Sequence, residues 1–196
     1  MITDINSAWK ELHERIASCR KCRLCETRIN TVPGEGPINA RVVIVGEAPG
    51  QEEDESGRPF VGRAGRLLTD ILEKGGDIRR NSIYITNMVK CRPPENRNPS
   101  SDEIRACSDF LEAQLLLLHP DIVVTMGNVP TQPLLNIKNG ITSLRGKFYD
   151  WRGIKLFPMF HPSYLLRNDS REFGSPRYLM WQDVKNLKAA IDKLEN

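Results

Sequence analysis

Several features that would assign this chain to common protein classes are absent from its sequence. Its 196 residues contain no apolar run long enough to span a bilayer, and the N-terminus lacks the pattern of a signal peptide. There is no GxxxxGK[ST] phosphate loop, no GxGxxG dinucleotide fingerprint and no GxSxG nucleophile elbow. These absences argue against membrane insertion, nucleotide binding of either kind and the α/β-hydrolase class. We expect a cytoplasmic, nucleoid-associated protein.

The chain also has little excess charge of either sign. Its formal net charge is +3, and charged residues make up 27% of a composition that is ordinary for a globular protein. The distribution is uneven: residues 47–56 carry five acidic side chains and no basic one, whereas residues 140–180 carry seven Lys or Arg and three acids. A basic half facing a polyanion and a solvated mixed-charge surface both fit this pattern. The length predicts a single domain spanning residues 1–196.

Short β-type runs alternate with helical patterns along the whole chain. Helical spacing of apolar residues predicts a helix over 6–18 and another over 64–72, and Ser100 and Ser175 read as N-caps of two longer helices. The expected strands are 41–45, 83–86, 121–126 and 154–160. This order predicts an α/β protein, a three-layer α/β/α sandwich around a central four-stranded parallel sheet.

Three polar loops follow the first, second and fourth expected strands. They begin at Gly46, Asn87 and His161, and the carboxyl ends of parallel strands meet at one edge of a sheet. We therefore expect the three loops to converge on a site. The first loop, GEAPGQEEDESGRPFVGRAG, is also compatible with a plain acidic surface loop. If it forms a wall of the site, we assign Glu47 and Glu53 to the site and expect Glu52, Asp54 and Glu55 to be solvated.

The cysteine pattern predicts a metal site rather than disulfides. Cys19 and Cys22 form a C-x2-C pair, and Cys91 and Cys107 follow at a distance. Four thiolates from such positions hold either a zinc ion or an iron–sulfur cluster. Cys107 lies on the apolar face of its expected helix and also fits a small core residue. Cys25 has no assigned role.

Taken together, the motifs resemble those of the family 4 uracil-DNA glycosylases, the iron–sulfur type of thermophilic bacteria and archaea. The resemblance spans nearly the full length, and it is carried by the first loop, by the cysteine spacing and by ITNMVKCRPPENRNP, FPMFHPSYLLRN and GSPRYLMWQDV. It implies a uracil-DNA glycosylase-like fold and a [4Fe–4S] cluster with a structural role. It implies the following cluster ligands: Cys19, Cys22, Cys91 and Cys107.

The activity that the resemblance implies is monofunctional uracil excision. Such an enzyme flips uracil out of DNA and hydrolyses the N-glycosidic bond, which leaves free uracil and an abasic site in the base excision repair of deaminated cytosine. The substrate is uracil-containing DNA, single- or double-stranded. We expect a monomer, and no sliding-clamp partner can be read from the sequence.

Uracil recognition requires a fixed donor and acceptor, because cytosine presents the reverse pattern. The Asn87 carboxamide at a strand end is suited to that task, although Asn also ends strands as a turn residue. Phe60 lies in a polar loop where a stacked base is a plausible neighbour, or where the ring anchors the loop in the core. By resemblance, Phe60 stacks on uracil, Glu53 blocks the thymine methyl group, and the backbone of Glu47 and Ala48 contacts the base.

Bond cleavage requires stabilisation of the departing base anion. His161 is the candidate donor to uracil O2, with a structural strand-end His as the alternative. Glu47 is the carboxylate nearest a strand end and is the candidate for orienting or deprotonating water. Related family 1 enzymes carry an aspartate one position later, where this chain has Ala48, so the identity of the base stays open.

The segment Leu165-Leu166-Arg167 has two interpretations. Apolar side chains in a polar loop fit a wedge that enters the minor groove of DNA. A helical turn that packs both leucines inward fits equally well.

For the whole chain, a non-catalytic iron–sulfur or zinc DNA-binding module is the alternative to an enzyme. A third hypothesis is a family 5 glycosylase. The Glu of GEAPG and the Asn of ITNMVK favour family 4 over family 5.

Overall fold

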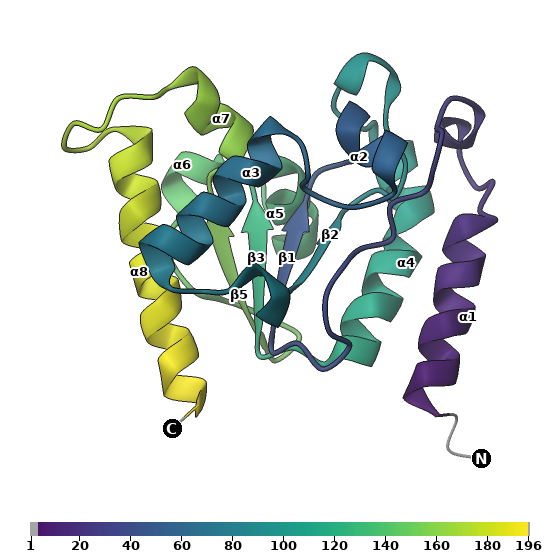
Figure 1. Ribbon diagram of the computed structural model, residues 1–196, viewed down its shortest axis with the longest axis horizontal. Helices are drawn as coiled ribbons and strands as arrows, with labels where there is room; N and C mark the ends of the chain where they lie inside the picture. Colours follow the sequence, from purple (N-terminus) through teal and green to yellow (C-terminus); the bar gives the residue numbers. More distant parts are fainter. Residues whose placement is uncertain (1–3, 196) are drawn as a thin grey trace.

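The computed structural model describes residues 4–195 and contains a five-stranded sheet in the order β2-β1-β3-β5-β4. Four of the strands are parallel, as predicted, and begin and end within two residues of the expected positions. The sheet is the middle layer of an α/β/α sandwich (Figure 1). The strands are β1 (Val42–Gly46), β2 (Tyr84–Asn87), β3 (Ile122–Met126), β4 (Tyr149–Trp151) and β5 (Ile154–Met159).

The fifth strand, β4, corrects the predicted four-stranded sheet. It runs antiparallel to β5 at the edge of the sheet. The two strands are joined at Arg152 and Gly153, which both have positive φ angles, of 54° and 83°. Two such residues in succession form the tight turn that suits a β-hairpin. The sequence hides this strand because it has only three residues, and none of them is buried.

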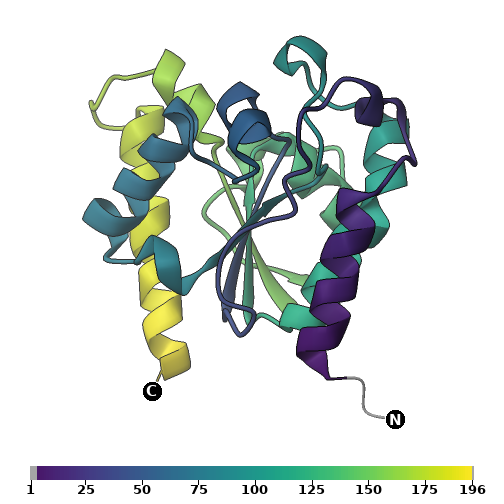
Figure 2. The same cartoon turned by 45° about the vertical axis from the view of Figure 1, so that its right-hand side comes forward.

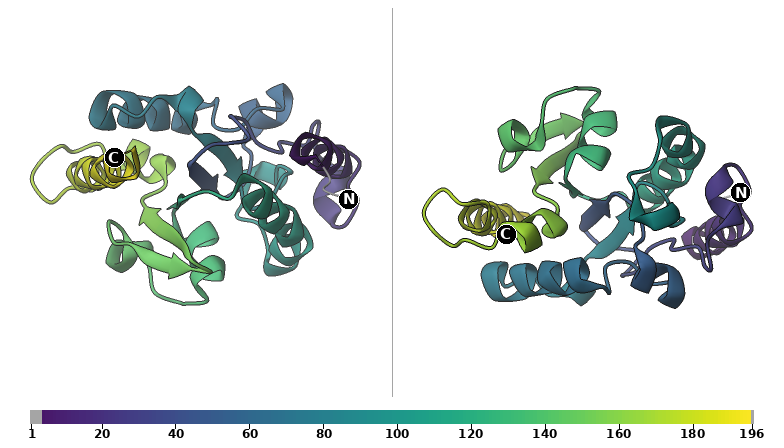
Figure 3. Two further views of the ribbon diagram at one scale, coloured as in Figure 1. Left: turned by 90° about the horizontal axis from the view of Figure 1, so that it is seen from below. Right: turned by 90° about the horizontal axis from the view of Figure 1, so that it is seen from above.

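Helices cover both faces of the sheet. Helices α3 and α8 lie against one face, and α4 lies against the other with α1 beside it near β2 (Figures 1 and 3). The predicted cap of α4 is present, since the Ser100 amide donates to the Glu103 carboxylate at 2.8 Å. The α-helices are α1 (Ile5–Ala17), α2 (Gln51–Ser56), α3 (Arg63–Asp70), α4 (Ser101–Leu118), α5 (Asn128–Leu135), α6 (Ile141–Leu144), α7 (Pro162–Arg167) and α8 (Pro176–Glu195).

Shorter helical turns connect these elements. A π-helical turn, Ile71–Gly75, extends α3 past residue 72, where the predicted helix ends. The remaining turns are 3-10 helices: Arg23–Glu26, Arg80–Ser82 and Pro94–Asn96. None of the helices among residues 4–195 combines the length and the apolar character needed to cross a membrane.

The acidic stretch after β1 forms a helix, α2, and one of its carboxylates is buried. Asp54 is 1% exposed and accepts hydrogen bonds from the backbone N–H groups of Ile29 and Asn30 at 3.0–3.2 Å. The prediction that Asp54 is solvated was wrong. The segment that covers it lies 24 residues earlier in the chain, so local sequence gives no sign of the contact. Glu52 and Glu55 are exposed, as predicted.

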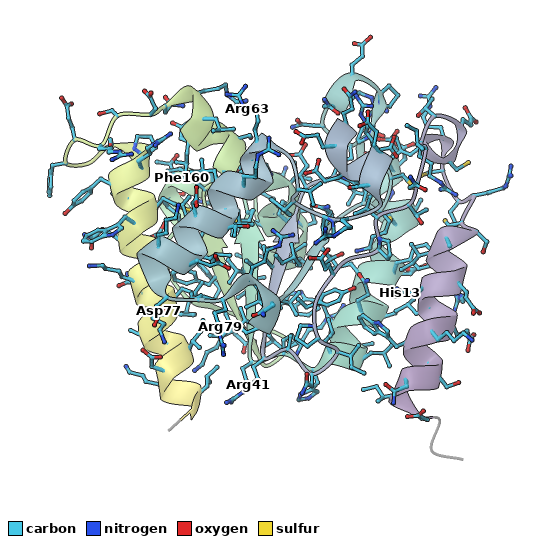
Figure 4. The ribbon with its side chains drawn as sticks, in the orientation of Figure 1. His13, Arg41, Arg63, Asp77, Arg79 and Phe160 are labelled. Carbon is cyan, nitrogen blue, oxygen red and sulfur yellow. The ribbon has the colours of Figure 1, made fainter. Side chains whose placement is uncertain are left out.

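The carboxyl ends of the parallel strands all lie at one end of the molecule. Helices α2 and α7 and the Pro94–Asn96 turn gather there (Figures 1 and 2). Figure 4 places Arg63 at this end of the molecule, and Arg41 and Arg79 at the opposite end. The three polar loops therefore converge as the sequence predicted.

Candidate active site

A cavity of about 710 Å³ opens at the carboxyl ends of the strands. The three predicted loops form most of its wall, and a parallel sheet is expected to bind ligands at this edge. Apart from Leu165 and Leu166, all of the residues predicted for uracil and DNA binding line it: Glu47, Ala48, Glu53, Phe60, Asn87, His161 and Arg167.

Asn87 enters this cavity from the end of β2. The residue is 2% exposed, and among the described residues its Oδ1 atom has no hydrogen-bond partner. Gly46 lies opposite on β1, and a Cβ atom there would collide with Asn87 Oδ1 and with the Phe60 ring. Glycine at position 46 therefore lets the two side chains meet. A buried, unpaired acceptor costs free energy unless a ligand satisfies it.

Phe60 is held in a backbone conformation that few non-glycine residues adopt. Its φ angle is 51°, and its ring is 7% exposed with a centroid 6.0 Å from that of His161. Gly65 packs directly against its backbone and leaves no room for a side chain. The Arg80 guanidinium donates to the carbonyls of Pro59 and Phe60 at 2.7 and 3.1 Å. These contacts fix the ring at the wall of the cavity.

Glu53 connects α2 to the Phe60 loop. Its carboxylate accepts from the N–H groups of Val61, Gly62 and Gly50 at 2.8–3.1 Å. Hydrogen bonds to an ionised acceptor are stronger than neutral ones, so this carboxylate holds the loop closed against α2. Glu53 therefore has a structural role that sequence reasoning missed.

His161 is positioned at the N-cap of α7. Its Nδ1 atom accepts from the Ser163 backbone N–H at 3.2 Å and lies 2.8 Å from Ser163 Oγ. Burial, together with the nearby Arg167 charge, lowers the pKa of His161 to about 4. The ring is therefore neutral at pH 7. Because Nδ1 accepts, the proton is on Nε2, and the ring has one donor to offer.

Glu47 lies on the first loop, immediately after β1. Its backbone carbonyl accepts from Val89 N–H at 3.2 Å, which ties the loop to the segment after β2. Burial raises the pKa of the Glu47 carboxyl above its usual range. A carboxylate whose charge is poorly solvated is a stronger base than an exposed one.

Part of the cavity wall comes from residues that sequence reasoning did not select, some of them in the proline-rich part of the predicted Asn87 loop. They belong to the exit of β3, the start of α6 and the proline-rich loop: Gly127, Asn128, Val129, Ile141, Thr142, Pro93, Asn96, Arg97 and Asn98. The loop after β3 also follows the carboxyl end of a parallel strand, so the same argument predicts that it lies at the site. Its Gly127-Asn128 sequence simply carries fewer chemically distinctive side chains. The contributions of α6 and the proline-rich loop depend on tertiary packing.

The leucines of α7 differ in their environment. Leu165 is fully buried in the core between α3, α8 and the sheet, so the structure argues against its predicted contact with DNA. A helical turn directs successive side chains to different faces, which places Leu165 inward and leaves Leu166 half-buried. Arg167 lines the cavity. Of the three predicted DNA contacts, Leu166 and Arg167 are therefore the two that reach the surface.

The five cysteines line a second, small cavity at the same end of the molecule. It lies between the end of α1, the Arg23–Glu26 turn and the start of α4, and its wall contains Cys19, Cys22, Cys25, Cys91 and Cys107. Their surroundings are apolar and include Ile16 and Phe110. No group of three or more His, Cys, Asp or Glu between residues 4 and 195 is arranged to hold a metal ion.

Several N–H groups point at the cysteine sulfurs. Arg28 donates to Cys91 Sγ at 3.1 Å, and the Lys90 backbone N–H donates to Cys107 Sγ at 3.3 Å. The backbone N–H of Lys21 lies 3.5 Å from Cys19 Sγ. Donors aimed at sulfur are typical of thiolate sites, where they stabilise negative charge.

Comparison with known proteins identifies the family of the chain. The model of the uracil DNA glycosylase superfamily matches residues 33–185. A type-4 uracil-DNA glycosylase of Thermotoga maritima is 48% identical over 182 residues, which cover 92% of this chain and 93% of that protein. The chain belongs to the type-4 uracil-DNA glycosylases.

Other members of the superfamily are similar to different degrees. The type-4 protein of Sulfurisphaera tokodaii is 41% identical, with 91% of this chain and 83% of that protein covered. A type-5 protein of Pyrobaculum aerophilum is 32% identical, with 71% and 69% covered. The family 4 resemblance noted in the sequence is thus confirmed, and the family 5 reading is the weaker one.

Proposed function

We propose that this glycosylase excises uracil from DNA by the following division of labour among its residues. The observation that carries the assignment is the unpaired Oδ1 of Asn87, buried between Phe60 and Gly46 at the bottom of a cavity. A flipped uracil presents an N3–H donor to Oδ1 and an O4 acceptor to the Asn87 amide N–H. Cytosine presents the reverse pattern and would leave buried groups unpaired. This disfavours cytosine relative to uracil by a factor on the order of 10⁴.

Phe60 provides the stacking surface for the flipped base. A base stacked on an aromatic ring gains about 1–3 kcal/mol. Glu53 excludes the methyl group of thymine, and it also holds the loop that carries Phe60. The backbone of Glu47 and Ala48 contacts the edge of the base. Geometry and shape thus select uracil before any bond is broken.

Cleavage of the N-glycosidic bond places negative charge on the uracil ring and positive charge on the sugar. His161 donates its Nε2–H to uracil O2 and stabilises the departing anion. Because Nδ1 of the neutral ring accepts from the Ser163 N–H, Nε2–H is the donor that remains for the base. Glu47 orients the water that attacks the sugar and accepts its proton. The products are free uracil and an abasic site.

The four-cysteine set suits an iron–sulfur cluster, because N–H groups are aimed at the sulfurs of Cys19, Cys91 and Cys107 and the surroundings are apolar. Cys19, Cys22, Cys91 and Cys107 would hold the cluster. When bound, it supplies iron–thiolate bonds that tie the segment after α1 to the proline-rich loop and to α4.

Leu166 and Arg167 are the proposed contacts to the DNA backbone and groove, and the substrate is uracil-containing DNA, single- or double-stranded. The protein acts as a monomer in this proposal. The test is release of free uracil from an oligonucleotide with one uracil, by protein purified with its metal content measured. Free uracil and an alkali-labile site support the proposal. Binding of the oligonucleotide without release of uracil would favour the alternative, a non-catalytic DNA-binding module.

A further inference from the structure

A second large cavity lies between α3 and α8, and α7 separates it from the candidate active site. Its volume is about 590 Å³, and we call it the α8 cavity. Leu165 of α7 lines it, whereas Tyr164 and Arg167 of the same helix line the active-site cavity. Figure 1 shows α7 beside the N-terminal part of α3, and the connection from α7 to α8 looping out above the start of α8. Nothing in the proposed chemistry uses this second cavity.

Three aromatic side chains form a continuous strip, in which Tyr178 and Trp181 line the α8 cavity and Phe173 lies outside it against Tyr178. The ring centroids of Phe173 and Tyr178 are 4.9 Å apart, and those of Tyr178 and Trp181 are 6.4 Å apart. Phe173 is 88% exposed and Trp181 is 43% exposed. Large apolar side chains that are grouped and exposed mark interaction surfaces. This aromatic strip therefore offers exposed aromatic surface to a ligand.

Cations accompany the aromatic strip. Lys185 Nζ lies 3.5 Å from the centroid of the Trp181 ring. Arg177 lines the cavity, and its Nε atom is buried without a hydrogen-bond partner among residues 4–195. Arg171 also lines the cavity. An unpaired guanidinium donor beside aromatic rings is suited to an acceptor such as a phosphate or a base carbonyl.

The acidic groups nearby are mostly neutralised. Asp70 at the cavity wall is paired with Lys74 at 2.6 Å, and Asp183 is buried in an ion pair with Arg145. Glu172 is exposed and has no cation partner in the structure as described for residues 4–195. The strip is thus surrounded by the cations Arg171, Arg177 and Lys185 and by one exposed acid, Glu172.

We propose that the aromatic strip and the α8 cavity bind unstacked nucleotides of the DNA strand that flanks the flipped uracil. Aromatic rings with interleaved cations are the means by which proteins bind single-stranded nucleic acid without reading its sequence. A strand leaving the active-site cavity over α7 meets this surface next. The proposal rests on the proposed function, because it takes DNA as the ligand. An apolar peptide is the competing occupant that the test must distinguish.

The first test measures affinity for a labelled single strand that contains no uracil. Phe173→Ser removes an almost fully exposed ring, and Trp181→Leu removes stacking while keeping an apolar side chain in the cavity. Each change is expected to weaken binding about tenfold. The matched control is Leu116→Ser on α4, which also replaces an exposed apolar side chain, 74% exposed, with serine. It is expected to leave binding unchanged.

The second test measures the dependence of binding on salt. Lys185→Gln and Arg177→Gln are each expected to reduce the slope of log affinity against log salt by about 0.7, the value for one phosphate contact on a single strand. Lys193→Gln, at an exposed lysine near the other end of α8, leaves the slope unchanged.

Equal DNA affinity in the wild-type protein and in both aromatic variants would overturn the proposal and would favour a peptide partner. If Trp181→Leu lowers the melting temperature, the exposed Phe173→Ser variant decides the question. Because the strand contains no uracil, this result does not depend on whether uracil is released. Failure of the proposed function and failure of this inference are therefore separate outcomes.

Discussion

Asn87 shows how packing turns a common strand-end residue into a recognition group. Its side chain is almost completely buried, and Gly46 opposite it lacks the Cβ atom that would collide with its Oδ1. The free energy lost in burying an unpaired amide is recovered only when a ligand with the right hydrogen-bonding pattern binds. Selectivity at this position therefore comes from the free energy lost when a ligand leaves the Asn87 amide unpaired.

Replacement of Asn87 by Asp keeps the shape and removes the N–H donor. We expect kcat/KM for uracil release to fall by on the order of 10²–10³-fold, as for loss of one preorganised donor. We also expect detectable release of cytosine, because a carboxylate accepts from its amino group. Oligonucleotides with uracil or cytosine at one position measure both effects.

Asn139→Asp provides the matched control, because it makes the same chemical change at an exposed residue. It should leave both activities unchanged. Unaltered preference for uracil over cytosine in the Asn87→Asp protein would show that another group reads the base.

His161 links the active site to the pH dependence of stability. In the unfolded chain the imidazole takes up a proton near its ordinary pKa of 6.5, whereas the folded protein resists protonation until the pH approaches 4. The unfolded state therefore binds more protons between these values, and stability falls as the pH is lowered through this window. Above pH 6.5 the contribution is fully retained.

The expected result is that lowering the pH from 7.5 to 5 costs the wild-type protein more stability than it costs a His161→Gln variant. Urea unfolding at each pH measures the difference. His119→Asn is the control, since asparagine tolerates the positive φ angle of 46° at that position. Identical losses in the wild-type and His161→Gln proteins would contradict the burial of a neutral ring.

At the scale of elements, α2 and the Phe60 loop behave as one unit joined by Glu53. The resemblance gave this residue a steric role, and the structure adds three hydrogen bonds from backbone N–H groups. Two substitutions separate these roles. Gln keeps the bulk of the side chain but weakens its acceptors, whereas Ala removes both the bulk and the acceptors.

We expect Glu53→Gln to lower the free energy of unfolding by about 1–3 kcal/mol while thymine is still excluded. Glu53→Ala should lower stability similarly and should also release some thymine. Chemical denaturation and a thymine-release assay distinguish the two. Glu52→Gln, at an exposed neighbour on the same helix, should change neither property. Release of thymine by the Glu53→Gln variant would contradict the steric role of Glu53.

The turn of α7 gives its two leucines different tasks. Leu165→Ala creates a cavity in the core and should cost about 2–5 kcal/mol of stability. Leu166→Ala should cost much less stability and should slow uracil release from duplex DNA more than from single strands, because a wedge matters only where a base pair must be opened. Equal effects on both substrates would reject the wedge.

At the scale of the whole molecule, the cysteine cavity joins three segments that are distant in sequence. If the proposed cluster is present, freshly purified protein is coloured and contains about four iron atoms per chain. Cys91→Ser should abolish both the colour and the iron and should lower the melting temperature. Cys25→Ser is the matched control within the same cavity and should retain both, so a colourless wild-type protein without iron would refute the cluster.

Much of the fold could be predicted because its signals are local. Apolar runs such as 42–45, helical periodicity and the Ser100 capping box each depend on neighbours in the sequence, and the structure confirms them. β4 escaped prediction because it is short and partly exposed. The burial of Asp54 escaped because its partners, the amides of residues 29 and 30, approach only in the folded chain.

The candidate site divides in the same way. The sequence by itself determined which loops meet, since parallel strands must end at a common edge, and it selected Asn87, Phe60 and His161 by their chemistry. Only the tertiary structure decided which way each side chain faces. That choice depends on contacts made across the chain, as between Gly46 and Asn87 or between Arg80 and Phe60, and such contacts have no period in the sequence. For the same reason Leu165 lies in the core, and only the fold reveals the aromatic strip beside it.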